Sequence, residues 1–319
     1  MKRALSKMFA VRAIRKILPC VMSAGLIASA TGEPAQSPAP AGANTLSWGE
    51  LSRMPLPPRA KRINYGDAPQ QFGELRLPNG DGPFPVMIVI HGGCWQNEFD
   101  YEYMTHLSAW LAGRGSATWT IEYRRLGDEG SGWPGTFLDV ANAADMLRQI
   151  AAKSPIDANR VYASGHSAGG QLALWLASRA RLEETSKLFI KDPLPIRGVL
   201  GLAAITDLAQ YRIGPPKSCH ASVEPLLGGP PEKVRERYAQ TSPIEHLPLA
   251  VPQVFIQGGK DPIVSADSVR SYAEAAKNAG DDAFILSLPS LGHFETAAPL
   301  PSTEAAFTEA LRVLMEPRS

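Results

Sequence analysis

Cysteine is scarce in this chain, with only Cys20, Cys94 and Cys219 among 319 residues. A disulfide framework of the kind that holds small secreted domains together needs several cysteine pairs, so the sequence excludes that class. The metal-ligand spacings C-x-x-C and H-E-x-x-H are also missing, and we expect no metal site. Cys94 and Cys219 leave room for one disulfide in an oxidising compartment.

A long hydrophobic run is missing as well. The longest apolar stretch, residues 17–30, is shorter than the about 20 residues that a membrane span needs, so we expect no stable span. Six Lys and Arg residues precede or open this stretch, no acidic residue occurs before Glu33, and the stretch ends in Ala28-Ser29-Ala30. This pattern predicts a secretory signal peptide over residues 1–30 and a secreted or periplasmic protein. A signal-anchor or a frayed basic helix is the alternative.

The sequence also lacks an excess of basic residues once the predicted signal peptide is set aside. The predicted signal peptide takes six of the 32 Lys and Arg residues and none of the 31 Asp and Glu residues, which leaves a net charge of −5. No basic run remains in the rest of the chain. Because nucleic acids are bound through clustered basic side chains, we expect no nucleic-acid partner.

The remaining chain has the composition of one globular domain, with 44% hydrophobic and 20% charged residues. Residues 31–60 are rich in Pro, Ala, Ser and Gly, which predicts a flexible or extended lead-in rather than core. Residues 61–319 form the predicted domain. No internal repeat is present.

Strand and helix patterns alternate along residues 61–319, and several of the strands are continuous apolar runs. Such runs are typical of strands that are covered on both faces. The alternation predicts an α/β fold with a mostly parallel sheet between helices. The expected strands are 71–77, 85–92, 117–124, 160–165, 196–204, 252–259 and 283–289, and the expected helices are 136–152, 168–182, 264–280 and 302–315.

Residues 208–250 interrupt this alternation, with many helix and strand breakers and no clear strand. A long insertion at this point of an α/β domain is usually functional, so we predict a lid or a pocket wall. An irregular surface excursion is the alternative.

The stretch VYASGHSAGGQLALWLA, residues 161–177, carries the main chemical signal. A strand, the motif G-x-S-x-G and a helix follow one another, which is the arrangement of a nucleophile elbow. Gly165 and Gly169 flank Ser167, so no side chain obstructs the turn. We predict that Ser167 is a catalytic nucleophile.

A serine nucleophile needs a histidine base and an acid that orients it, in the chain order Ser, Asp or Glu, His for this fold. His293 follows a strand in the loop LPSLGHFE, whereas His220 and His246 fall in the insertion. Because ligands and catalytic groups gather at the carboxyl ends of parallel strands, His293 is the predicted base. Asp261 follows the strand VFIQGG and is the predicted acid. Asp207 is its rival, with capping of the insertion as the alternative role.

The stretch VIVIHGGCW places two glycines after another strand. Backbone N–H groups of Gly92 and Gly93, together with that of Ala168, can stabilise an oxyanion. His91 is expected to hold the loop by hydrogen bonding. Cys94 has no elbow and is not favoured as a nucleophile.

Three aromatic residues are tentative pocket residues because they follow strands or lie in loops near the expected site. They are Trp95, Tyr123 and Trp133. Apolar packing against the edge of the sheet is the alternative for each.

With HGGCW, EYRR, WPGTFLDVANAADML and GHSAGGQLALWLASR in view, the sequence resembles the α/β-hydrolase superfamily. It is most similar to the branch of bacterial feruloyl- and acetyl-esterase-like and kynurenine-formamidase-like proteins, over roughly Tyr65 to Val313. The resemblance implies an α/β-hydrolase fold and hydrolysis through an acyl-enzyme without a cofactor. It places the nucleophile on Ser167, the acid on Asp261 and the base on His293.

We therefore expect a serine carboxylesterase that acts on small-molecule esters, including aryl, acetyl or feruloyl esters. An arylformamidase of the kynurenine-formamidase type and a prolyl-oligopeptidase-like peptidase use the same machinery and are the alternatives. Formamidases of this type share the HGG-x-W loop. Tryptophan breakdown, in which they act, is an intracellular pathway, so the predicted secretion signal argues against a formamidase. A non-catalytic binding protein of the same fold is less favoured because the triad is complete.

Overall fold

A computed structural model of the chain describes residues 45–315. The predicted signal peptide, residues 1–30, and residues 31–44 of the predicted lead-in lie outside the described residues. Within 45–315, no helix combines the length and the apolar character that crossing a membrane requires.

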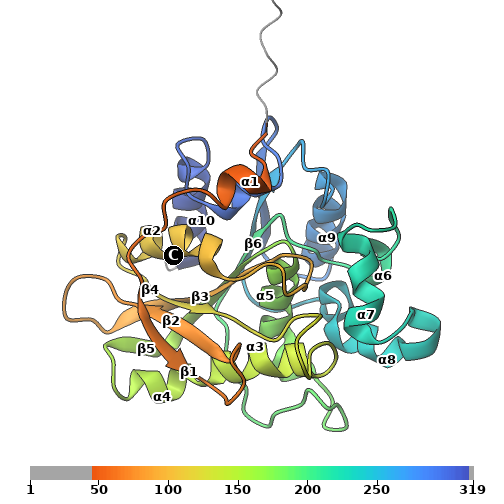
Figure 1. Cartoon of the computed structure of the whole chain (residues 1–319), viewed down its shortest axis with the longest axis horizontal. Helices are drawn as coiled ribbons and strands as arrows, with labels where there is room; N and C mark the ends of the chain where they lie inside the picture. The colour runs from red at the N-terminus through yellow and green to blue at the C-terminus, as the bar shows by residue number, and fades with distance from the viewer. Residues whose placement is uncertain (1–44, 316–319) are drawn as a thin grey trace, which may run out of the picture. The chain divides into compact units, whose positions relative to one another are not determined.

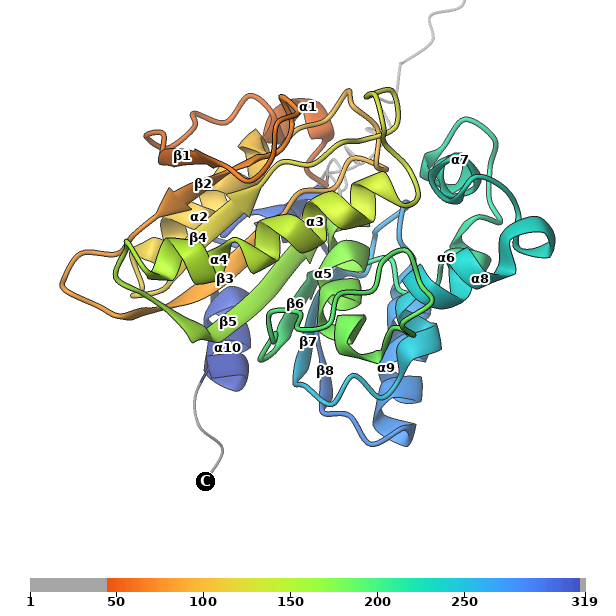
Figure 2. The same ribbon diagram turned by 90° about the horizontal axis from the view of Figure 1, so that it is seen from below.

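One eight-stranded sheet forms the centre of the fold, with the strand order β1-β2-β4-β3-β5-β6-β7-β8 (Figures 1 and 2). Strand β2 is antiparallel to both of its neighbours, and the strands from β4 to β8 are parallel. All seven strands expected from the sequence are confirmed, and β1 is added at the edge. The bounds are β1 (Lys61–Asn64), β2 (Phe72–Arg76), β3 (Phe84–Ile90), β4 (Ala117–Ile121), β5 (Ile156–His166), β6 (Val199–Leu202), β7 (Gln253–Gly258) and β8 (Ala283–Leu288).

The apolar strands are buried on both faces, as their sequences predict. In β3, Val86, Ile88 and Ile90 pack into one core, whereas Met87 and Val89 pack into the other. Successive side chains of a strand point to opposite faces, so a continuous apolar run serves two layers of helices. The sheet therefore lies between two layers of helices. The loops that follow the parallel strands lie at its carboxyl edge, which these helices do not cover.

The helices on the first face are α3 (Gly135–Asp145), α4 (Leu147–Ala151), α5 (Ala168–Ser178) and α9 (Ala266–Asn278). The second face is covered by α2 (Thr105–Ala112) and α10 (Glu304–Met315). Figure 2 shows α3 and α5 in front of the sheet and α9 beside β8. The single helix expected over residues 136–152 is divided at Met146 into α3 and α4. Helix α2 was not expected.

The segment before β1 differs from the sequence prediction. Residues 45–60 are not a detached lead-in, because α1 (Trp48–Leu51) packs on the domain and Leu51 is 1% exposed in the second core. Ser47 and Glu50 form a capping box that starts this helix. The prediction that this part of the chain lies outside the core is therefore wrong.

The insertion 208–250 is helical in the structure and contains no strand. It consists of α6 (Leu208–Tyr211), the 3₁₀ helix η3 (Cys219–Ser222), α7 (Val223–Leu227), α8 (Pro231–Thr241) and the 3₁₀ helix η4 (Pro243–His246). In Figure 2 these helices form a group beside α5 and α9. The insertion follows β6 along the chain and therefore begins at the carboxyl end of that strand.

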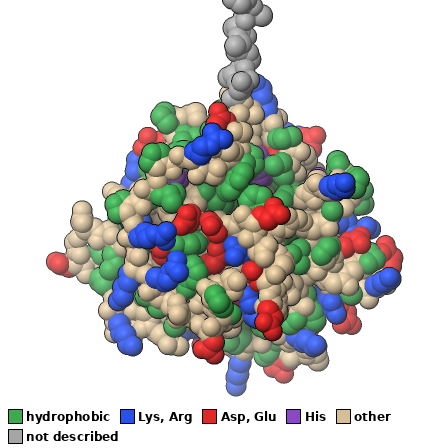
Figure 3. Space-filling model, viewed as in Figure 1, with side chains coloured by type: hydrophobic (Ala, Val, Ile, Leu, Met, Phe, Trp, Pro, Cys, Tyr) green, Lys and Arg blue, Asp and Glu red, His purple; other side chains and the backbone are tan. Residues whose placement is uncertain are grey.

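Charged side chains are mixed on the visible face of the molecule. In Figure 3, Lys and Arg side chains alternate with Asp and Glu side chains and do not gather into one basic patch on that face. Among residues 45–315, no group of three or more His, Cys, Asp or Glu side chains is arranged to hold a metal ion.

Candidate active site

Ser167 lies at the turn between β5 and α5, with φ 56° and ψ −118°. A non-glycine residue in this sparsely populated region carries about 1–3 kcal/mol of backbone strain. A Cβ on Gly165 would lie 2.0 Å from the carbonyl oxygen of Gly169, and one on Gly169 would lie 2.3 Å from that of Ile90. Both glycines are required for the turn to close and to pack on β3. The structure therefore holds the serine in the strained geometry of an elbow.

Asp261 and His293 are brought together from the loops after β7 and β8. His293 Nδ1 lies 2.7 Å from Asp261 Oδ2, and both side chains are buried. The backbone N–H groups of Ile263 and Val264 donate to Asp261 Oδ1 at 2.8 and 2.9 Å. The carboxylate is thus fixed in orientation and accepts a hydrogen bond from Nδ1–H of His293, which leaves Nε2 available as a base.

Ser167 and His293 line the same pocket. No hydrogen bond joins the serine hydroxyl and the imidazole in the structure as described. Such a bond is often long in an empty enzyme and shortens when substrate binds. The three predicted triad residues therefore meet at one edge of the sheet, where β5, β7 and β8 end.

The oxyanion loop, residues 91–95, follows β3 and runs beside the elbow. A Cβ on Gly92 would lie 3.1 Å from Cβ of Ser167. The N–H of Gly92 donates to the hydroxyl of Tyr103 at 2.6 Å, so it does not point to a developing oxyanion. The prediction for Gly92 is wrong in this respect. The N–H groups of Gly93 and Ala168 have no acceptor among the described residues and remain the candidate donors.

The oxyanion loop contains three successive residues with positive φ: 95° at Gly93, 57° at Cys94 and 56° at Trp95. Side chains rarely accept this conformation. Two anchors hold it. Trp95 is fully buried and donates from Nε1 to Gln171 at 3.2 Å. Cys94 forms a disulfide with Cys219 in η3, which links the loop to the insertion.

The pocket at Ser167 is small and aromatic, with a volume of about 170 Å³. Trp48 of α1 is at the centre of its aromatic wall, and its ring centroid is 5.1 Å from that of Phe99, 5.3 Å from that of Tyr103 and 6.0 Å from that of Phe294. The disulfide and Ile263 complete the lining. A segment far from the triad in sequence therefore closes the pocket.

Glu295 connects the segment around α1 to the loop that contains His293. Its carboxylate is almost fully buried and accepts the N–H of Leu46 at 2.7 Å and that of Gly292 at 3.1 Å. The carboxylate of Glu295 thus holds the backbone two residues before Trp48 and the backbone next to His293.

The three tentative pocket aromatics do not line the Ser167 pocket. Trp95 and Tyr123 are fully buried, and Tyr123 stacks on His91 and donates its hydroxyl to the carbonyl of that residue at 2.9 Å. Trp133 lies under the guanidinium of Arg237, whose Cζ is 4.4 Å from a ring centroid. Packing, the alternative role, describes all three. These pocket predictions are wrong.

The rival triad residues have other roles. Asp207 is the N-cap of α6 and accepts the N–H of Gln210 at 3.0 Å. His220 bonds through Nδ1 to the carbonyl of Tyr211, and neither His220 nor His246 is among the residues that line the Ser167 pocket. His91, as predicted, holds its loop, with Nε2 at 2.8 Å from a carboxylate oxygen of Glu122.

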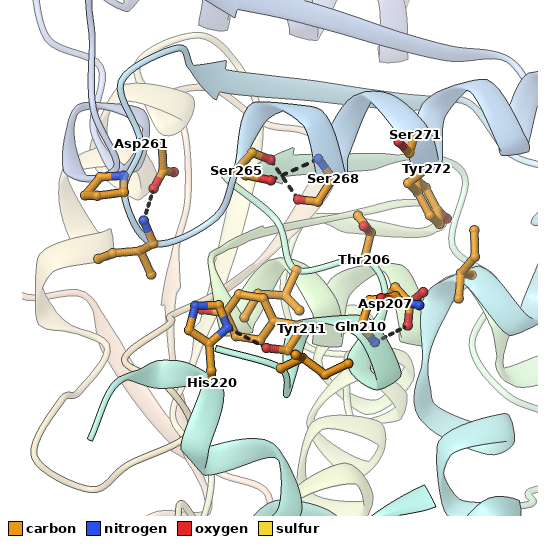
Figure 4. A pocket seen from close by; sticks show the side chains of 15 residues that line it. Thr206, Asp207, Gln210, Tyr211, His220, Asp261, Ser265, Ser268, Ser271 and Tyr272 are labelled. Atoms are coloured by element: carbon orange, nitrogen blue, oxygen red, sulfur yellow. Dashed lines mark hydrogen bonds between the residues drawn. The ribbon is translucent and has the colours of Figure 1, made fainter. Parts of the chain in front are cut away.

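A larger cleft of about 530 Å³ lies next to the small pocket, between the insertion and α9. Figure 4 shows Ser268 and Ser271 of α9 on one side of it and Tyr211 and His220 on the other. Ile263 lines both cavities. The cleft combines several isoleucine side chains with hydroxyl groups, and the hydroxyl of Tyr211 is buried there without a hydrogen-bond partner among residues 45–315.

Comparison with known proteins identifies the family of this chain. The family model described as BD-FAE matches residues 75–275. The chain belongs to the BD-FAE family. Esterase LipC of Mycobacterium tuberculosis is 24% identical over 265 residues, which cover 73% of this chain and 59% of LipC. This chain therefore spans little more than half the length of that relative.

Solved structures show that this member of the BD-FAE family has the α/β-hydrolase fold. Esterase Est2 of Thermogutta terrifontis matches with a TM-score of 0.66 and 20% identity, covering 85% of this chain and all of Est2. A truncated carbohydrate esterase from gut microbiota matches with a TM-score of 0.67 and 21% identity, covering 79% and 96%.

Sequence reasoning missed the residues that shape the pocket. Trp48 was hidden in a Pro-rich stretch, although the spacing of Ser47 and Glu50 was a local signal for a helix start. Tyr103 and Glu295 carried no motif, because their roles depend on contacts between distant segments.

Proposed function

We propose that this protein is a serine carboxylesterase in which Ser167, Asp261 and His293 form the catalytic triad. The observation that carries the proposal is the buried His293–Asp261 pair, 2.7 Å apart, in the same pocket as a serine with strained backbone. Relatives named as esterases support the activity, and no finding favours a formamidase or a peptidase. A form of the Thermogutta terrifontis esterase is described as phosphorylated by paraoxon.

Each group has one role in the proposed mechanism. Ser167 Oγ attacks the ester carbonyl while Nε2 of His293 takes the hydroxyl proton, and Asp261 stabilises the imidazolium. The N–H groups of Gly93 and Ala168 hold the oxyanion. The intermediate collapses as His293 protonates the departing alcohol, which leaves an acyl group on Ser167. A water molecule, deprotonated by His293, then releases the acid and restores the serine.

The sizes of the two cavities favour an ester whose acyl group is small and whose alcohol group is large. A volume of about 170 Å³ at Ser167 is below the about 300 Å³ from which ligand pockets usually start, so it suits a short acyl group. The cleft of about 530 Å³ suits the larger alcohol part of the ester. We infer hydrolysis of short-chain acyl esters of bulky alcohols.

We also infer that the protein works outside the cytoplasm. The signal-like residues 1–30 motivate this inference, and the Cys94–Cys219 disulfide supports it, because such bonds persist in oxidising compartments.

Hydrolysis of p-nitrophenyl acetate and labelling by a fluorophosphonate probe test the activity together. Ser167→Ala should abolish labelling and lower kcat by about 10⁴-fold or more, because the nucleophile is lost. Asp261→Asn should lower kcat about 10⁴-fold, because the imidazole then adopts the wrong tautomer.

Asp207→Asn is the matched control, because asparagine caps a helix as well as aspartate does and nearly keeps the shape of this side chain, which lines the larger cleft. It should leave kcat within about twofold of the parent enzyme. An Asp207→Asn loss as large as that of Asp261→Asn would reject the assigned acid. Labelling of the Ser167→Ala protein at the original rate would reject the nucleophile.

A further inference from the structure

A chain of hydrogen bonds runs behind Ser167 from the oxyanion loop to the base loop. The N–H of Gly92 is 2.6 Å from Oη of Tyr103, and that oxygen is 3.0 Å from Nδ1 of His166. Nε2 of His166 is 3.1 Å from the carbonyl oxygen of His293. Tyr103, His166 and His293 are each at most 4% exposed, so solvent does not compete for these bonds.

The direction of every bond in this chain is fixed by its ends. A backbone N–H only donates, so Tyr103 Oη accepts from Gly92. A carbonyl only accepts, so Nε2 of His166 carries a proton and donates to His293. In a neutral imidazole the other nitrogen is then an acceptor, and it receives the hydroxyl proton of Tyr103. One arrangement of protons satisfies all four groups.

The neutral form of His166 that this arrangement needs is also the favoured one. Burial, together with the neighbouring His293, holds the pKa of His166 well below its usual value. Burial raises the pKa of the Tyr103 hydroxyl, so the phenol keeps its proton. If His166 were charged, both ring nitrogens would donate, and the hydroxyl proton of Tyr103 would lose its acceptor.

We propose that Tyr103 and His166 are positioning residues that set the distance between the oxyanion loop and the base loop across Ser167. Neither side chain has a step in the reaction. They act through Gly92, which precedes the oxyanion donor Gly93, and through the backbone of the base His293. The proposal rests on the assigned triad and adds a link between its two sides.

The lack of a side chain at residue 92 supports this link. A Cβ on Gly92 would lie 2.5 Å from the carbonyl oxygen of His166 and 3.1 Å from Oη of Tyr103. The oxyanion loop therefore approaches the elbow as closely as backbone atoms allow. A small displacement of Gly92 would move the N–H of Gly93 away from the position of the oxyanion, at a cost to the transition state.

Tyr103→Phe tests the proposal, because it removes one hydroxyl and keeps the ring that packs on Trp48. The change leaves a buried N–H at Gly92 and a buried acceptor at His166 without partners. We expect kcat for p-nitrophenyl acetate to fall about tenfold, with KM within about twofold, because misplaced donors act on the transition state.

Tyr101→Phe is the matched control for this change. Tyr101 is also buried and donates its hydroxyl to Glu74 at 2.8 Å, but it has no bond to the loops at Ser167. It should lower the melting temperature and leave kcat within about twofold, because it removes a buried hydrogen bond away from the reaction. Equal losses of kcat in both variants would mean that Tyr103 only stabilises the fold.

Two changes at His166 separate the two bonds of its ring. In His166→Gln the amide N–H₂ replaces Nε2 and keeps the bond to His293, whereas in His166→Asn the amide oxygen replaces Nδ1 and keeps the bond to Tyr103. Adding Tyr103→Phe to His166→Gln should lower kcat by a smaller factor than Tyr103→Phe does in the parent enzyme, because the bond between Tyr103 and residue 166 is already absent and only the acceptor of the Gly92 N–H is lost. Adding it to His166→Asn should cost about tenfold again.

Additive losses in both backgrounds would overturn the proposal, and so would a Tyr103→Phe enzyme with unchanged kcat. Failure of the proposed function gives a different result. An unmodified protein that neither hydrolyses esters nor reacts at Ser167 with the fluorophosphonate would overturn the triad and this positioning role together.

Discussion

The two cavities at the carboxyl edge of the sheet differ in how firmly their walls are held. The pocket at Ser167 is walled by Trp48, by the Cys94–Cys219 disulfide and by loops whose backbone is fixed by buried groups such as Glu295. The neighbouring cleft is lined in part by exposed side chains, among them Ile213, which is 65% exposed. For the proposed esterase, this difference predicts strict selection for one part of the ester and loose selection for the other.

The disulfide should have the largest effect on the firm wall. Cys94→Ser with Cys219→Ser, or reduction of the parent enzyme, frees residue 94 from a conformation that side chains rarely adopt. We expect kcat for p-nitrophenyl acetate to fall about tenfold, because loss of one oxyanion donor costs about 10²–10³ and here the donor is only displaced. Steady-state kinetics with and without a phosphine reductant measure this effect.

Cys94→Asn with Cys219→Ser is the control for that prediction. Asparagine tolerates positive φ better than serine, so this pair should recover several-fold of the lost kcat without any covalent link. Equal activity of the two double variants, or full activity after reduction, would show that the disulfide contributes stability and does not shape the oxyanion loop.

Trp48→Ala should have the next largest effect, since it removes the central ring of the firm wall. The ratio of kcat/KM for p-nitrophenyl octanoate to that for the acetate should rise about tenfold, because each methylene that a hydrophobic pocket accepts is worth about 1–3 kcal/mol. Trp110→Ala, on α2 and away from both cavities, should leave the ratio unchanged. An unchanged ratio in Trp48→Ala would place the acyl group elsewhere.

The smallest effect is expected in the open cleft. Ser271→Trp fills part of it from α9 and should raise KM about threefold for acetyl esters of bulky alcohols, because only loose contacts are lost. Methyl acetate should react as before. Lys277→Trp, farther along the same helix and outside the cleft lining, is the control. Equal KM changes for methyl and bulky esters would contradict the division of the substrate between the two cavities.

The residues proposed as the triad could be located in the sequence because their signals are local. Ser167 has glycines on both sides, and Asp261 and His293 each follow an apolar strand. Parallel strands bring such loops to one edge whatever their distance along the chain. The same logic gave the sheet, since strands buried on both faces are readable as continuous apolar runs.

The walls of the pocket could not be predicted in the same way. Trp48 reaches Ser167 through contacts with segments more than fifty residues away, and composition around it suggested a lead-in. Gly92 shows a second limit, because its motif indicates an oxyanion donor but the direction of its N–H depends on Tyr103. A sequence motif shows where a loop lies. The hydrogen-bond partner of each backbone N–H in that loop depends on which distant residues pack against it.

The disulfide also changes how the protein would respond to a protease. Cys94 and Cys219 are separated by 125 positions and enclose β4, β5, β6 and the nucleophile in a covalent ring, while Asp261 and His293 lie outside it. A single cut anywhere inside that ring would leave the two fragments joined. The nicked enzyme would migrate as one band on a non-reducing gel and separate into two only after its thiols were reduced.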